Sequence, residues 1–363
     1  MTMVKRIGIL TAGGDCPGLN AVIRGVSKSA MSRYGMEVIG IMDGFSGLMK
    51  RNARKLTGRD VSGILTLGGT ILGSSNKDNP FDQARYVRGK LIHEDVSDHV
   101  VRNYNSLGLD ALVCLGGDGT LAVSSKLMKK GLNIVNVPKT IDNDVSETDL
   151  TFGFDTAVAN ATDAIDKVHT TAMSHHRVLI VETMGRYAGW LALTSGIAGG
   201  GDIILIPEIP YDLEKVCSKV VERSKKGKRF SIIVVSEGAC PKGGCMVIRD
   251  IVEDSPEKIR LGGVSQKLAK DIEALTRIES RAMILGHLQR GGSPTAFDRV
   301  LATRFGTKAT ELVAEEKFGY MVALKGKDVK EALIEKAASK LRLVTPDHPL
   351  IKSAEAVGTC LGY

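Results

Sequence analysis

Short apolar runs alternate with longer stretches of helical periodicity along most of the chain. The runs include residues 7–10, 38–41, 111–115 and 134–137, and each is short enough to be a buried strand. Strands that alternate with helices are typical of parallel sheets, because parallel strands need a crossover connection that is usually a helix. The pattern therefore predicts an α/β fold with mainly parallel sheets flanked by helices.

Most of the predicted strands lead into a turn that contains glycine together with charged or polar residues. These turns begin at Thr11, Asp43, Gly116, Pro138, Glu182, Ser236 and Gly286. Open α/β sheets bind ligands at the carboxyl ends of their strands. Because so many turns share this composition, we expect them to line one crevice and not to be scattered surface loops.

The length of 363 residues exceeds what one hydrophobic core usually supports, so two lobes are expected. Residues 153–156 are predicted to mark a boundary, followed by a helix over 157–173 that a Thr or Asp caps. The tail has helical periodicity over residues 329–341, which predicts a further helix there.

Composition narrows the classes of partner. Hydrophobic residues make up 43% and charged residues 25%, as in globular proteins of the aqueous phase. The net charge of +8 is compatible with nucleic-acid binding, but aromatics are only 4% and no basic tract is interleaved with them. No apolar stretch approaches membrane-spanning length, and the N-terminus runs directly into a strand. We expect small, multiply charged anions as partners, no nucleic acid, no membrane and a cytoplasmic location.

Residues 138–144 concentrate chemical groups just past one predicted strand. Pro138 should end that strand, because proline cannot donate to a sheet ladder. The run then supplies Lys139, a hydroxyl, an amide and the two carboxylates of Asp142 and Asp144. Such a set suits an acid/base and phosphate site. A solvated turn is the alternative, and it would be the default if the run stood alone.

A second cluster, residues 116–120, lies upstream with the sequence Gly-Gly-Asp-Gly-Thr. It follows a predicted strand and precedes a helical stretch over 121–130, a geometry in which backbone N–H groups face an anion. Asp118 is a hard oxygen ligand suited to Mg²⁺. The run matches neither the dinucleotide fingerprint nor the P-loop, and by itself it fits a structural turn equally well.

With residues 11–20, 184–186 and 286–292, these two clusters resemble the 6-phosphofructokinases in order and spacing, from residue 4 to about 305. The extended tail looks like that of the group with both ATP and pyrophosphate users. The resemblance implies a glycolytic kinase that transfers the γ-phosphoryl group of ATP to O1 of fructose 6-phosphate. The products would be fructose 1,6-bisphosphate and ADP.

The resemblance also implies two Rossmann-like lobes with the active site between them. The donor lobe would comprise residues 1–153 and about 289–340. The sugar-phosphate lobe would comprise 154–288 and about 341–363. Mg²⁺ would be the cofactor, and the assembly would be a homodimer or homotetramer whose active sites are shared between subunits.

By resemblance, Asp142 is the base that accepts the proton of the attacking hydroxyl, with Thr140 and Arg186 beside it. Asp118 would hold Mg²⁺. The donor would be bound by Gly14, Asn76, Lys77, Gly117, Asp118, Gly119, Thr120 and Lys139. The sugar phosphate would be bound by Thr140, Ile141, Asp142, Arg177, Met184, Gly185, Arg186, Glu237, Arg281, His287, Leu288, Gln289 and Arg290. Arg177 and Arg281 would reach in from a neighbouring subunit.

Two residues favour different phosphoryl donors. Family members that use pyrophosphate carry Asp where Gly119 stands, and a carboxylate there would repel an α-phosphate. Lys139 points the other way, because common bacterial ATP users have glycine at that position. A lysine can hold the transferring phosphate from either donor, so Gly119 favours ATP. Asn76 replaces an arginine of the common bacterial enzymes, and Lys77 is a candidate for supplying the lost charge.

Three alternatives remain open from the sequence. A pyrophosphate-dependent, reversible phosphotransferase would have the same fold. Another kinase class with the Gly-Gly-Asp-Gly-Thr run, such as the NAD or lipid kinases, is disfavoured by residues 184–186 and 287–292. A non-catalytic nucleotide sensor is disfavoured because Asp142 is present.

Overall fold

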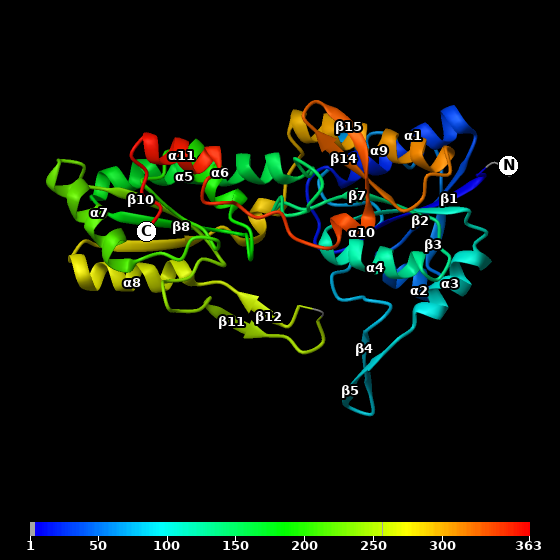
Figure 1. The fold of residues 1–363 in the computed structure, drawn as a ribbon, viewed down its shortest axis with the longest axis horizontal. Helices are drawn as coiled ribbons and strands as arrows, with labels where there is room; N and C mark the ends of the chain where they lie inside the picture. Colours follow the sequence, from blue (N-terminus) through cyan, green and yellow to red (C-terminus); the bar gives the residue numbers. More distant parts are fainter. Residues whose placement is uncertain (1–3, 256) are drawn as a thin grey trace.

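The computed structural model describes residues 4–255 and 257–363. Two sheets lie side by side along the length of the molecule (Figure 1). One has seven strands in the order β15-β14-β7-β6-β1-β2-β3, and the other has four in the order β13-β8-β10-β9. The predicted α/β fold with mainly parallel sheets flanked by helices is confirmed.

Five strands of the larger sheet are parallel, and the antiparallel strands β3 and β15 form its two edges. Its strands are β1 (Arg6–Thr11), β2 (Glu37–Ile41), β3 (Ala53–Leu56), β6 (Ala111–Gly116), β7 (Ile134–Pro138), β14 (Tyr320–Lys325) and β15 (Asp328–Leu333). Ile7 pairs with Ala111 and Leu112 with Ile134. This register aligns the carboxyl ends of β1, β6 and β7.

Alternate side chains of these strands face two separate cores, as strand geometry requires. Ile7 and Ile9 face the core that contains α1 and α9, whereas Leu10 faces the core that contains α3, α4 and α10. These helices and their neighbour α2 are α1 (Leu19–Tyr34), α2 (Phe45–Lys50), α3 (Ser97–Ser106), α4 (Asp118–Met128), α9 (Ala296–Ala314) and α10 (Ile334–Ala337).

The smaller sheet is wholly parallel and is also covered on both faces. Its strands are β8 (Val178–Thr183), β9 (Ile203–Leu205), β10 (Ser231–Ser236) and β13 (Ser280–Ile284). Its helices are α5 (Phe154–His175), α6 (Trp190–Ala198), α7 (Leu213–Lys225), α8 (Val264–Thr276) and α11 (Pro349–Ala356). The short 3-10 helices are η1 (Ile64–Thr66) and η2 (Gly286–Arg290).

Two hairpins project from the sheets (Figure 1). They are β4 (Gln83–Val87) with β5 (Lys90–Glu94), and β11 (Ile248–Ile251) with β12 (Ile259–Leu261). Among the described residues, the structure contains no helix that is long and apolar enough to cross a membrane.

The helix predicted over 329–341 is wrong. Residues 328–333 form β15, which pairs with β14 along its whole length, and only Ile334–Ala337 is helical. The prediction failed because residues 328–333 are held as a strand by pairing with β14, and hydrophobic periodicity within the segment does not reveal that pairing. Pro138 is the last residue of β7 and not the first one after it, so the strand extends one residue further than predicted.

The cap of α5 also differs from the prediction. The helix begins at Phe154 after Gly153, whose φ of 94° is left-handed, and no local side chain caps it. The carboxylate of Asp298 in α9 accepts hydrogen bonds from the N–H groups of Gly153 (2.9 Å) and Thr156 (2.8 Å). The helix N-terminus is therefore satisfied by a residue distant in sequence.

The chain passes between the sheets more than once. α9, β14 and β15 follow the smaller sheet in sequence but join the larger one, and α11 then packs on α6. The domain boundaries proposed for residues 153/154, about 288/289 and about 340/341 stay a prediction.

Candidate active site

The loops after β1, β6 and β7 meet the loops after β8, β10 and β13. Arg290, which follows β13, donates a hydrogen bond of 2.9 Å to the backbone oxygen of Asp15, which follows β1. Burial, together with the charge of Asp142 after β7, raises the pKa of Glu237 after β10. Carboxyl ends of strands from both sheets thus line one crevice.

Asp142 has a free acceptor within this crevice. Its backbone N–H donates to the hydroxyl of Thr140 at 3.0 Å, but its buried Oδ1 has no hydrogen-bond partner among the residues that the structure describes. Burial raises the pKa of the carboxyl, and the charges of Arg290 and Lys139 oppose that rise. A buried carboxylate oxygen without a donor is unsatisfied, which makes it a candidate acceptor for a hydroxyl of a ligand.

The backbone around Asp142 is fixed by its neighbours. Asn143 has a left-handed φ of 53°, and its side-chain oxygen accepts the N–H of Thr151 at 3.1 Å. The hydroxyl of Thr151 donates to the backbone oxygen of Thr140 at 2.7 Å. Ile141 is fully buried and anchors the loop to the core. We call residues 139–151 the Asp142 loop. These contacts hold the loop, and with it the backbone of Asp142, in one position.

Negative charge accumulates beside Asp142. Burial, with the charges of Asp142 and Asp118, raises the pKa of Asp144 to about 7. Burial, with the charges of Asp142 and Glu182, raises the pKa of Glu237 to about 7. A cation, or hydrogen-bond donors such as sugar hydroxyls, would relieve this repulsion.

Asp118 is the exposed first residue of α4, and Gly117 precedes it at the N-cap. Within the described ranges, no group of three or more His, Cys, Asp or Glu is arranged to hold a metal ion. Mg²⁺ commonly binds through one or two carboxylates together with substrate phosphates and water, so an exposed Asp118 among other carboxylates fits that ion.

Lys139 connects the Asp142 loop to the glycines after β1. It is only 4% exposed, its ammonium donates to the backbone oxygen of Gly14, and burial lowers its pKa. Beside it lies a hollow of about 340 Å³. The hollow is lined by Gly13, Gly14, Asp15, Thr70, Ser74 and Asn76.

Gly119 borders open space. A Cβ built on Gly119 would meet no atom within 4 Å, whereas one on Gly117 would meet the backbone oxygen of Lys139 at 3.4 Å. Thr120, the next residue of α4, is buried. The structure therefore leaves room for a side chain, or for part of a ligand, at Gly119.

The loop after β8 presents Arg186. Gly185 has a φ of 127°, and a Cβ there would lie 2.5 Å from the hydroxyl of Ser236, so glycine is required. The Arg186 guanidinium donates to the backbone oxygen of Ile259 in β12 at 2.5 Å and lies 3.6 Å from Glu257. Met184 donates its N–H to Gln289 at 3.3 Å, which joins this loop to η2.

Two further predicted residues, His287 and Leu288, line a second hollow of about 580 Å³. Arg290 is not among the residues that line this hollow. Its guanidinium lies against Gly14, since a Cβ built on Gly14 would be 2.9 Å from it. This position places Arg290 next to the donor glycines and Asp142, so its assignment to the 6-phosphate of the sugar stays a prediction.

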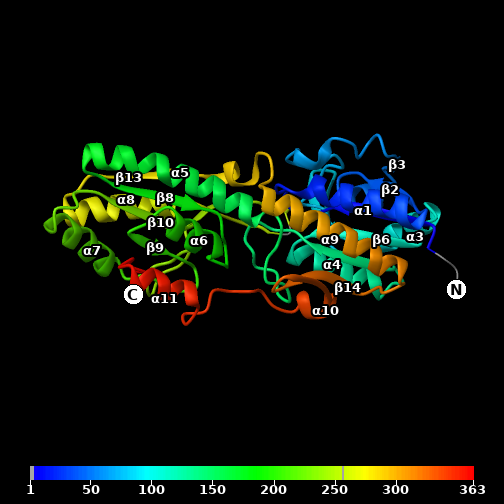
Figure 2. The same cartoon turned by 90° about the horizontal axis from the view of Figure 1, so that it is seen from above.

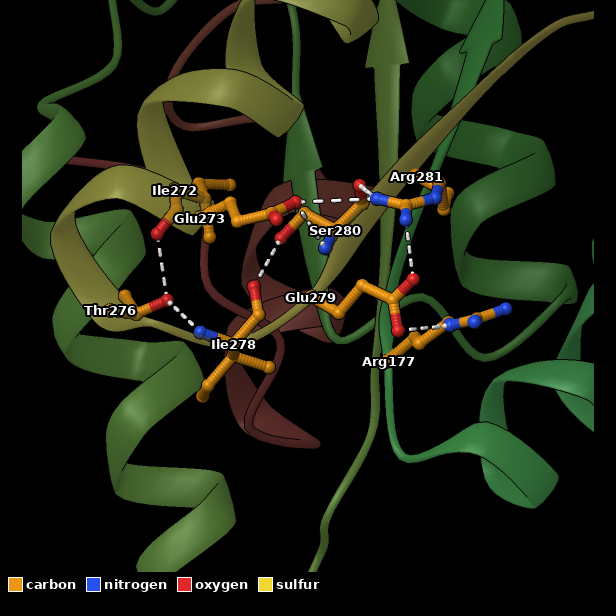
Figure 3. Close-up of polar contacts among 8 residues, drawn as sticks. All are labelled: Arg177, Ile272, Glu273, Thr276, Ile278, Glu279, Ser280 and Arg281. Atoms are coloured by element: carbon orange, nitrogen blue, oxygen red, sulfur yellow. Dashed lines mark hydrogen bonds and ion pairs between the residues drawn. The ribbon is translucent and has the colours of Figure 1, made fainter.

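The structure does not bring Arg177 and Arg281 to this crevice. Both lie at the amino ends of β8 and β13, where both guanidinium groups pair with Glu279 (Figure 3). The six-residue strand β8 separates its two ends by about 20 Å. Lys77 is also turned away from the hollow, because its ammonium pairs with Asp254 at 3.0 Å.

Two residues near the crevice, Glu182 and Glu257, were not assigned roles from sequence. Glu182 is buried and accepts the N–H groups of Gly263 and Ser265, at 2.9 Å each. Glu182 begins one of the turns with glycine and charge that follow the predicted strands, and this position could have marked it as a candidate from sequence. Glu257 lies in the β11–β12 hairpin, and no local pattern marks it.

The raised pKa of Glu237 has a consequence for stability. Between about pH 4.5, the usual value for Glu, and about pH 7, the folded chain binds more protons at this carboxyl than the unfolded chain. Stability should therefore fall as the pH rises through this window. We expect Glu237→Gln to flatten the dependence of the melting temperature on pH between about 5 and 8.

Glu214→Gln is the matched control, because Glu214 is an exposed carboxyl on α7. Melting temperatures followed by circular dichroism at several pH values provide the comparison. Equal slopes for Glu237→Gln and the unmodified protein would contradict the prediction.

The fold and the crevice define an α/β phosphotransferase with two mainly parallel sheets. The family model described as phosphofructokinase matches residues 6–313. The chain belongs to the phosphofructokinase family.

Relatives match over nearly the full length. The chain is 53% identical over 360 residues to ATP-dependent 6-phosphofructokinase 2 of Clostridium perfringens, covering 99% of this chain and 98% of that protein. It is 49% identical to ATP-dependent 6-phosphofructokinase 3 of Bacteroides thetaiotaomicron, covering 98% and 100%.

Solved structures agree on the fold. Pichia pastoris phosphofructokinase in the T-state superposes with a TM-score of 0.79 at 31% identity, over 93% of this chain and 36% of the yeast chain. The present chain thus spans about a third of that protein. A pyrophosphate-dependent phosphofructokinase from Marinobacter aquaeolei gives a TM-score of 0.79 at 20% identity, covering 99% and 93%.

Proposed function

We propose that this chain is an ATP-dependent 6-phosphofructokinase, which transfers the γ-phosphoryl group of ATP to O1 of fructose 6-phosphate. The products are fructose 1,6-bisphosphate and ADP, as in glycolysis, and the site of action is the cytoplasm. Relatives at 53% and 49% identity bear the ATP-dependent description. The observation that carries the mechanism is the buried Oδ1 of Asp142 between the two sheets, which lacks a hydrogen-bond partner within residues 4–255 and 257–363.

Asp142 accepts the proton of the O1 hydroxyl as that oxygen attacks phosphorus. Thr140 receives the backbone N–H of Asp142 and so keeps the carboxylate oriented. Arg186 exchanges its contact with Ile259 for the transferring phosphoryl group and neutralises its charge. Phosphoryl transfer depends mainly on positioning and charge neutralisation, which these residues supply.

The donor phosphates lie along Gly14, Gly117, Gly119 and Thr120, with Lys139 beside them. Backbone N–H groups at the start of α4 favour anions. Asp118 would hold Mg²⁺, which would supply positive charge to the phosphate oxygens. Asn76 borders the hollow beside Lys139, where the donor would lie. Lys77 can add its positive charge to the donor phosphates only if its ammonium leaves Asp254.

The sugar phosphate lies against the loops of the smaller sheet. Glu237 accepts hydrogen bonds from sugar hydroxyls, and the segment from His287 to Arg290 borders the 6-phosphate. Planar guanidinium groups suit phosphate oxygens. Arg177 and Arg281 act on the site of a second copy of the chain.

We accordingly propose a homodimer or homotetramer with shared active sites. The far position of Arg177 and Arg281 supports this assembly, since one chain cannot bring them to its own crevice. Large apolar side chains are also exposed along the edge strand β13 and the segment after it. They are Ile284, Leu288, Phe297 and Val300.

The donor is tested by steady-state assays with fructose 6-phosphate, Mg²⁺ and either ATP or pyrophosphate. Because Gly119 leaves open space beside the start of α4, kcat/KM is expected to be higher with ATP. The buried Lys139 favours the second candidate, the reversible pyrophosphate-dependent enzyme. A higher kcat/KM with pyrophosphate would reverse the assignment of the donor and leave the acceptor unchanged.

A further inference from the structure

Residues 338–348 connect α10 on the larger sheet with α11 on the smaller one (Figure 2). We call this segment the crossing segment. On its way it runs along the Asp142 loop: Leu341 forms an isolated bridge with Val145, and the N–H of Arg342 donates to the backbone oxygen of Asp144 at 2.7 Å. The segment is thus fastened directly beside the proposed base.

The Arg342 side chain makes two contacts at once. Its guanidinium donates to the backbone oxygen of Asn143 at 3.2 Å, and its central carbon lies 4.0 Å from the ring centroid of Trp190. The Trp190 indole returns a hydrogen bond of 2.9 Å to the backbone oxygen of Arg342. Trp190 is only 4% exposed, so this cation–π contact is largely shielded from water.

Trp190 is the first residue of α6, and the loop that ends at its N-terminus presents Arg186. A second contact links the crossing segment to the N-terminal end of α6, through Glu208. Val344 donates its N–H to Glu208 at 2.8 Å, and the same carboxylate accepts the N–H of Gly189 at 3.0 Å. Arg342 therefore joins the backbone of the Asp142 loop to the helix that follows Arg186.

We propose that Arg342 is a positioning residue, which sets the placement of Asp142 relative to Arg186. The inference rests on the roles given to these two residues in the proposed function. They come from different sheets, and no hydrogen bond among the described residues joins residues 139–151 directly to residues 184–189. Small misplacement of reacting groups costs up to about 100-fold in rate, so a link of this kind acts mainly on kcat.

The test uses Arg342→Met and Arg342→Ala in the full-length enzyme. Methionine retains an unbranched apolar stem against Trp190 but cannot donate to Asn143. We expect kcat to fall by about 10- to 100-fold in both variants. KM for both substrates should stay within about threefold, because the groups that bind them remain in place. Lys340→Ala is the control, since it removes an exposed positive charge from the same segment.

Trp190 is the only tryptophan in the chain, so its fluorescence reports on this contact. Fructose 6-phosphate together with ADP is expected to change the emission of the unmodified enzyme. In Arg342→Met the change should be lost, although the melting temperature shows that the protein is folded. Should Arg342→Ala fail to fold, Arg342→Met is decisive.

An unchanged kcat in Arg342→Met would overturn the inference, and so would a raised KM at constant kcat. Asp142→Asn is measured in the same assay. If it lowers kcat while Arg342→Met does not, the positioning role alone is refuted. If Asp142→Asn also leaves kcat unchanged, the proposed mechanism fails.

Discussion

Asp142→Asn is expected to lower kcat by about 10²- to 10⁴-fold, the usual contribution of a positioned general base. Asparagine has nearly the same shape, but its amide does not accept a proton at neutral pH. KM values should change little, because Glu237, Lys139 and the backbone of the glycine turns remain in place. Steady-state rates of ADP formation, measured with both substrates saturating, give the comparison.

The control is Asp166→Asn, the same substitution at an exposed position of α5. It should leave kcat unchanged. In the unmodified enzyme, kcat should also fall as the pH drops through the raised pKa of Asp142, because the protonated carboxyl is no longer a base. Loss of this acid limb in Asp142→Asn would support the role, whereas full activity would place the base elsewhere.

Gly119→Asp is expected to reduce kcat/KM for ATP by about 10³-fold. Two unit charges 4 Å apart interact by about 4 kcal/mol at an effective dielectric of 20, and 1.4 kcal/mol corresponds to a factor of ten. The variant should fold, because a Cβ at residue 119 meets no atom within 4 Å. A carboxylate in the first turn of α4 also interacts favourably with the positive end of the helix dipole. Pyrophosphate, which has no nucleoside or α-phosphate, should lose far less.

Gly119→Asn separates charge from size, because it adds nearly the same volume without the negative charge. If repulsion decides the preference, Asn should retain most of the ATP activity that Asp loses. Equal losses in both variants would assign the effect to steric exclusion. Unchanged kcat/KM for ATP in Gly119→Asp would refute the argument from residue 119 altogether.

The buried strands and their polar endings could be predicted from sequence, because both signals are local. The run after Pro138 and the run after Leu115 each follow a strand of the same sheet, and the parallel register places them together. The prediction failed at residues 329–341, where pairing with β14 outweighed a helical periodicity. It also failed for the cap of α5, which comes from Asp298 in another helix.

Other features of the crevice depend on contacts between distant segments. Arg342 lies in a tail without any motif, and only the folded chain places it on Trp190. The pairing of Lys77 with Asp254 likewise joins a loop of the larger sheet to the β11–β12 hairpin. No periodicity or spacing within either segment encodes such pairs.

The late arrival of β14 in the larger sheet bears on synthesis of the protein. As the nascent chain leaves the ribosome, β7 emerges early, yet its outer neighbour follows only after the whole smaller sheet. Until then β7 presents unpaired N–H and C=O groups, and α1 lacks its packing partner α9. The exposed edge is a site for misassociation between nascent chains, and a truncation before Tyr320 would make it permanent.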